Sequence, residues 1–110
     1  MKRLFLVCAL LVAGSAWAQA PQGKVNTPIA DVTVGSAATL IAPLDSSRVA
    51  LSCTNNDASV AVRWGSSAVT ATSGQQLKAG ASIEILSRDA VYMISEGATV
   101  TVSCTKETLQ

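Results

Sequence analysis

Two cysteines, Cys53 and Cys104, are the residues of this 110-residue chain whose chemistry is easiest to assign. Each closes a stretch of alternating apolar and polar residues, 49–53 and 100–104. Because side chains two apart share one face of a strand, both cysteines are expected on an apolar, inward face. In an oxidising compartment such a pair predicts a disulfide, whose loop of about 50 residues is worth roughly 4 kcal/mol in the chain-entropy model. Two free thiols are the alternative, and they require a reducing setting.

No residue pattern in the sequence predicts catalysis. The chain has no histidine, which excludes Ser–His and Cys–His nucleophile pairs and removes the usual zinc ligand. Glu84 and Asp89 are five residues apart and offer two carboxylates, but seven scattered acids produce such a pair by chance. Residues 55–57, Asn-Asn-Asp, lack the spaced acidic loop that calcium needs. We therefore expect a protein that is not an enzyme and holds no metal or cofactor.

The charge balance argues against several partners. From Gln19 onward the chain carries six basic and seven acidic residues, a net charge of −1. A chain without a basic stripe is a poor ligand for nucleic acid, and one without a polybasic patch is a poor ligand for anionic lipid. We expect a protein partner or self-assembly, while the sequence is silent on small molecules.

The N-terminus predicts export. Residues 1–3 are a short basic start, 4–13 are apolar, and Ala16-Trp17-Ala18 places small residues where signal peptidase cleaves. The apolar run is shorter than the roughly 20 residues that span a bilayer, so no membrane span is expected. Cleavage after Ala18 delivers the chain through the inner membrane, to a periplasmic, extracellular or virion-associated location.

The elements that position the cysteines are short strands. Turn signals recur about every 8 to 12 residues, which is typical of a sandwich or barrel. We predict an all-β fold, a small antiparallel β-sandwich or partly open barrel, over residues 29–106. A flexible arm is expected over 19–28, a frayed tail over 107–110, and a hairpin turn at 55–57. Further strands are predicted at 29–34, 39–42, 60–64 and 82–85, and at 91–94, whose continuous apolar run suits a strand covered on both sides.

Three residues are candidates for a binding surface. Trp64 shares a strand face with two valines, which favours core packing, although Trp is also favoured at binding surfaces. Arg63 is expected on the opposite, exposed face, and Tyr92 is the other aromatic residue after the signal. Arg48 and Arg88 precede predicted strands and are expected to act as gatekeepers against aggregation.

Most of the chain after the signal, from Thr39 to Val102, resembles small β-sandwich proteins of bacteriophage structural gene clusters, of the head-fibre or decoration type. The matching positions are residues 48–52, Asn55, residues 60–65, Val69-Thr70, Gly74, Leu77, Gly80, Ile83 and residues 90–92. The resemblance implies a β-sandwich that makes protein contacts in an assembly. Most tailed-phage particles assemble in the cytoplasm, so the signal peptide implies either a virus assembled at or across the inner membrane or a bacterium that exports such a domain for its own use.

Cys53, Trp64 and Cys104 also resemble, more weakly, the cysteine and tryptophan pattern of immunoglobulin-like sandwiches, although Val102 stands where those domains have tyrosine. Together these features predict an exported, non-enzymatic structural or adhesive interaction module, such as a virion-associated or surface-assembly protein. The alternative is a monomeric periplasmic binding or inhibitor domain.

Overall fold

The computed structural model describes residues 23–109, in which all regular structure is β-strand. The predicted signal peptide and residues 19–22 of the predicted arm lie outside the described residues. The eight strands are β1 (Lys24–Val34), β2 (Thr39–Ala42), β3 (Arg48–Asn55), β4 (Val62–Gly65), β5 (Gln75–Leu77), β6 (Ser82–Ile85), β7 (Val91–Ser95) and β8 (Val100–Leu109).

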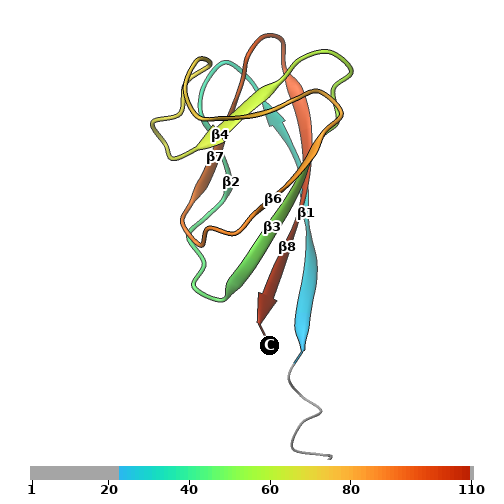
Figure 1. The fold of residues 1–110 in the computed structure, drawn as a ribbon, viewed down its shortest axis with the longest axis vertical. Coiled ribbons are helices and arrows are strands. Elements are labelled where there is room, and N and C mark those ends of the chain that lie inside the picture. The colour runs from blue at the N-terminus through green and yellow to red at the C-terminus, as the bar shows by residue number, and fades with distance from the viewer. Residues whose placement is uncertain (1–22, 110) are drawn as a thin grey trace, which may run out of the picture.

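The strands form two four-stranded antiparallel sheets packed as two layers (Figure 1). Sheet A has the order β1-β8-β3-β6, and sheet B has the order β2-β7-β4-β5. The first strand pairs with the last, the second with the seventh, the third with the sixth and the fourth with the fifth. This nested pairing is the strand order of an eight-stranded jelly roll. The predicted all-β sandwich with one disulfide is confirmed.

Alternation along the strands builds the core between the sheets. In β8, Val100, Val102 and Cys104 are buried while Thr101 is exposed, as the period of two requires. Sheet B contributes Val62, Leu77, Val91 and Met93 from its own inner face. The stretch 91–94 is only partly covered on both sides, because Tyr92 on the outer face remains partly exposed.

The disulfide joins neighbours within sheet A. Cys53 on β3 and Cys104 on β8 are direct cross-strand partners with Cα atoms 4.1 Å apart, and both are buried. In immunoglobulin domains the disulfide connects the two sheets. The immunoglobulin-like interpretation is therefore wrong for this chain, because its cysteines and its strand order belong to a different arrangement.

Three local predictions need correction. The arm predicted to Pro28 is ordered from Lys24 onward, since Lys24–Pro28 pair with Thr105–Leu109; the same pairing makes 107–109 strand rather than a frayed tail. Residues 55–57 do not form a hairpin turn, because β3 and β4 lie in different sheets and the chain crosses between them. β5 was not predicted, because its three residues, Gln-Gln-Leu, are too few to show alternation.

Candidate functional site

Arg63 and Tyr92, two of the three predicted surface residues, lie on the outer face of sheet B. β4 and β7 are neighbours, with Gly65 opposite Tyr92 and Arg63 opposite Ile94. Leu40 on β2 is the other cross-strand neighbour of Tyr92 and is 44% exposed. The structure therefore places a partly exposed aromatic ring beside an exposed leucine on this face.

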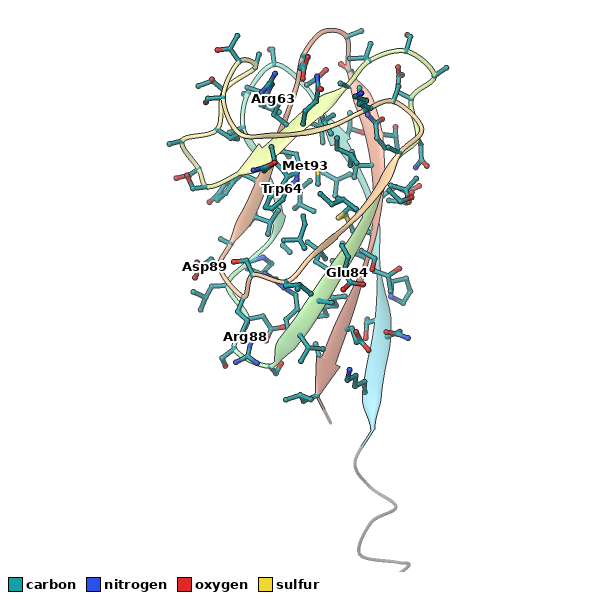
Figure 2. The ribbon with its side chains drawn as sticks, in the orientation of Figure 1. Arg63, Trp64, Glu84, Arg88, Asp89 and Met93 are labelled. Carbon is teal, nitrogen blue, oxygen red and sulfur yellow. A yellow bond between two sulfur atoms is a disulfide. The ribbon has the colours of Figure 1, made fainter. Side chains whose placement is uncertain are left out.

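Trp64 lies on the opposite side of the same strand and packs into the core. It is the cross-strand partner of the buried Met93, and the two side chains lie between the sheets (Figure 2). Its indole Nε1 is buried without a hydrogen-bond partner among residues 23–109. The expectation that Trp64 shares the inner face with Val62 agrees with this placement, and Trp64 does not form one surface with Arg63 and Tyr92.

The Arg63 side chain is held by a polar cluster. Its Nε donates to Glu96 Oε2 at 3.1 Å, and its Nη1 donates to the backbone carbonyl of Gly74 at 3.2 Å. Gln76 Nε2 donates to the same Glu96 oxygen at 2.8 Å. Because its charge is paired and two of its N–H groups are bound within the chain, Arg63 helps to hold the β4–β5 connection, and its guanidinium is only partly available to an anion.

Arg48 is the polar residue whose placement differs most from prediction. It is 1% exposed rather than a gatekeeper at a strand edge. Its guanidinium donates to the backbone carbonyls of Pro43 (3.0 Å), Ser87 (2.9 Å) and Asp89 (2.7 Å). A register shift between Arg48 and Ala50 turns the side chain inward, and strict alternation gives no signal of such a bulge.

Arg88 is also structural. Its Nε donates to the Arg48 carbonyl at 3.1 Å, and its own carbonyl accepts from the Asp45 N–H at 3.0 Å. Both arginines therefore tie the β2–β3 loop to the β6–β7 loop. The two loops expose Leu44 and Leu86, each 68% accessible, at this end of the sandwich.

The outer face of sheet A is rich in Ser and Thr, as the alternation along β8 predicts. Asn56 Nδ2 donates to Ser103 Oγ at 2.6 Å, and Ser103 Oγ donates to Asp31 Oδ1 at 2.9 Å. Ser103 and Lys106 have the Ser-x-x-Lys spacing of some nucleophile pairs. An odd separation puts them on opposite faces of β8, and Lys106 lies 3.9 Å from Asp45, so the two do not form a dyad.

The structure does not bring the two carboxylates of Glu84 and Asp89 together. Glu84 is exposed on β6, and Asp89 lies apart from it near the start of β7 (Figure 2). Hydrogen bonds from the Ser47 hydroxyl and N–H lower the pKa of Asp45, and those from the Ser59 and Val60 N–H groups lower the pKa of Asp57.

Within residues 23–109 no three metal-ligating side chains gather, and no helix is long and apolar enough to cross a membrane.

Asn55 is a further polar residue with a role that the sequence did not reveal. It ends β3, is fully buried, and donates from Nδ2 to the carbonyls of Val60 (2.9 Å) and Leu77 (3.2 Å). Its Oδ1 accepts the Asp57 N–H at 2.9 Å. The Asn55 side-chain amide thus holds the segment that crosses between the sheets. The sequence does not show this role, because Asn is equally common in simple turns.

Comparison with known proteins finds a solved chain with a similar fold. No protein family model and no curated protein sequence matches. The similar chain comes from Bacillus endospore appendages, described as a family of disulfide-linked pili; it is 20% identical, with a TM-score of 0.46. The match covers 81% of this chain and 91% of that one. At this level the similarity says nothing about activity or partners.

Proposed function

We propose that this chain is an exported, non-enzymatic structural module that works through contact with other protein chains. The placement of the disulfide carries the proposal. Cys53 and Cys104 join β3 and β8, the two inner strands of sheet A, so the sheet is covalently held at its centre, and among residues 23–109 nothing pairs with its two outer edges. An open sheet edge is a template for pairing with another chain.

The polar side chains support a structural role over a catalytic one. Arg48 donates hydrogen bonds to backbone carbonyls, Arg63 donates to Glu96, and Ser103 donates to Asp31. A catalytic nucleophile needs an adjacent base that is free to take its proton. Ser103 and Ser47 do donate to carboxylates, those of Asp31 and Asp45, but both pairs are exposed, and a solvated carboxylate is too weak a base to activate a hydroxyl at neutral pH.

The proposed compartment follows from the disulfide and the N-terminal pattern. Disulfides persist in oxidising environments and are rare in the cytosol. The resemblance of residues 39–102 to phage structural sandwiches favours assembly into a larger particle, either a virion or a cell-surface structure. Adhesion to a target through the free faces is the finer form of the same proposal.

One observation favours a second candidate, a monomeric binding or inhibitor domain. Leu44 and Leu86 are both 68% exposed on loops joined by Arg48. Exposed apolar side chains on fixed loops are suited to occupying a pocket on another protein. Such a domain acts alone, whereas an assembly subunit is found in large particles.

The test is fractionation of the native producer into soluble periplasm, membranes and released particles, followed by peptide mass spectrometry. A soluble periplasmic protein and a known surface protein serve as fraction markers. We expect this chain in released or surface-bound particles. Recovery as a free monomer in the periplasmic fraction contradicts the structural module and favours the inhibitor.

A further inference from the structure

The backbone of β6 directs its free hydrogen-bonding groups away from sheet A. The 4.1 Å spacing of Cys53 and Cys104 marks a narrow antiparallel pair, which does not exchange backbone hydrogen bonds. Cys53 therefore bonds toward β6, where its partner is Ile83. The backbone of Asn55, two residues further along β3, bonds in the same direction. Its N–H donates to the Ala81 carbonyl at 2.9 Å, and its carbonyl accepts from the Gly80 N–H at 3.0 Å.

Since bonding direction alternates along a strand, Ser82 and Glu84 point their N–H and C=O groups outward. In the described chain β6 pairs only with β3. Ser82 and Glu84 are exposed, and Ile83 between them is half-buried against the core. The outer side of β6 is thus a free sheet edge that carries a partly covered isoleucine.

The other three edges carry features that oppose strand pairing. On β1 the same alternation turns Pro28 outward, where it supplies no N–H, and the ladder is irregular between Ile29 and Val32. β2 is irregular between Leu40 and Ala42, and Pro43 follows it.

β5 has three residues and follows Gly74, whose φ of 107° departs from extended backbone. Within residues 82–85 β6 contains no proline, glycine or register shift. It is therefore the edge least protected against pairing.

We propose that β6 pairs with β6 of a second copy of this chain, antiparallel and related by a two-fold axis, so that Ile83 of each copy lies opposite Ile83 of the other. This inference rests on the proposed structural function and names the surface of self-contact. The contact is isologous, meaning that one patch serves both copies, and it joins two A sheets edge to edge.

The register follows from the side chains. With Ile83 at the axis, Ser82 of one copy faces Glu84 of the other, and these two exchange the outward backbone bonds. Ile83, which is half-buried in the single chain, becomes covered by its equivalent. An axis at Glu84 places two carboxylates directly opposite, which destabilises an antiparallel pair. An axis at Ile85 covers a side chain that is already 1% exposed and so gains little.

The first test is a cross-link. Residues at a narrow antiparallel pair have Cα atoms about 4.5 Å apart, close to the spacing of this chain's own disulfide. The full chain with Ile83→Cys is therefore expected to form a disulfide-linked dimer under mild oxidation, seen on a non-reducing gel. Val25→Cys is the control, since Val25 is an exposed β-branched residue on β1, and it is expected to stay monomeric.

The second test removes one outward donor. Glu84→Pro deletes an N–H that β3 does not use, and Asn26→Pro does the same on the outer side of β1. Sedimentation equilibrium is expected to show a dimer dissociation constant at least tenfold higher for Glu84→Pro, and no change for Asn26→Pro. Circular dichroism checks that both variants fold, and the cross-link decides the question if Glu84→Pro does not.

The outcomes separate this inference from the proposed function. If the wild-type chain self-associates but Ile83→Cys gives no cross-link and Glu84→Pro associates normally, the β6 contact is overturned and the structural function stands. If the wild-type chain stays monomeric at millimolar concentration and Ile83→Cys gives no dimer, the β6 contact is also overturned. The native fractionation then decides the proposed function independently.

Discussion

The Arg48 guanidinium donates a 2.7 Å hydrogen bond to the backbone carbonyl of Asp89, 41 residues further along the chain. The same group also reaches the carbonyls of Pro43 and Ser87, so a single buried cation connects the β2–β3 and β6–β7 loops. No carboxylate of the described chain lies within ion-pair distance of it, and its Nε has no partner there. The backbone dipoles of these carbonyls therefore stabilise the charge.

Arg48→Ala should destabilise the fold strongly, because it leaves three carbonyls without donors. Hydrogen bonds to charged groups contribute about 1.5–3 kcal/mol each, so the loss of three partly buried ones is expected to lower the free energy of unfolding by at least about 3 kcal/mol. Arg63→Ala is the matched control, since its ion pair with Glu96 is on the surface and such pairs are worth about 1 kcal/mol or less. Urea unfolding measures both, and equal losses for the two variants contradict the assigned role of Arg48.

Reduction of the disulfide should lower stability by roughly 4 kcal/mol, because the bond closes a loop with a sequence separation of 51. The double variant Cys53→Ala/Cys104→Ala, measured by urea unfolding, is expected to match the reduced wild-type chain within about 1 kcal/mol. Since both cysteines are buried, a reducing thiol such as dithiothreitol should reach and cleave the disulfide only as the chain unfolds. Fast reduction of the native chain by dithiothreitol contradicts this expectation.

The parts of the fold that follow from alternation were predictable, and the parts that depend on bulges and crossings were not. Cys53 and Cys104 were correctly paired, because each lies in a regular strand. The predicted exposure of Arg48 is wrong because one register shift reverses the face of every residue before it in the strand. The hairpin turn predicted at 55–57 is wrong because local residue type does not show whether a chain returns within one sheet or crosses to the other.

The candidate surface was only partly predictable for the same kind of reason. Period-two reasoning separated Trp64 from Arg63 correctly, but the residue facing Tyr92 depends on which strands become neighbours. That pairing of β7 with both β2 and β4 is set by the nested jelly-roll order. The free edge of β6 likewise emerges only when the strand order is known, since every strand has two edges until its neighbours are assigned.

Gly74→Ala should be destabilising, because Gly74 has a φ of 107° and a Cβ there would lie 2.6 Å from Val69 Cγ2 and 2.9 Å from the Trp64 carbonyl oxygen. The backbone oxygen cannot move away cheaply, so we expect a loss of about 2 kcal/mol or more. Gly35→Ala is the matched control, since nothing lies within 4 Å of its Cβ position. Thermal unfolding should show a change within about 1 kcal/mol for Gly35→Ala; similar losses for both variants count against this account.

Asp57 should make stability depend on pH in the acid range. The N–H groups of Ser59 (2.9 Å) and Val60 (2.6 Å) donate to its carboxylate and hold its pKa below the ordinary value of 3.8. A carboxyl group whose pKa is lower in the folded chain stabilises it above the unfolded pKa, and this contribution is lost as the pH falls through the folded pKa.

Asp57→Asn removes this titration. In urea unfolding between pH 7 and pH 2, the wild-type chain is therefore expected to be more stable than Asp57→Asn at neutral pH, with the difference shrinking below pH 3.8. Ser59→Ala keeps both backbone donors and should retain nearly the wild-type pH dependence. A difference between the wild-type chain and Asp57→Asn that stays constant across this range would show that the carboxylate charge does not stabilise the crossing between the sheets.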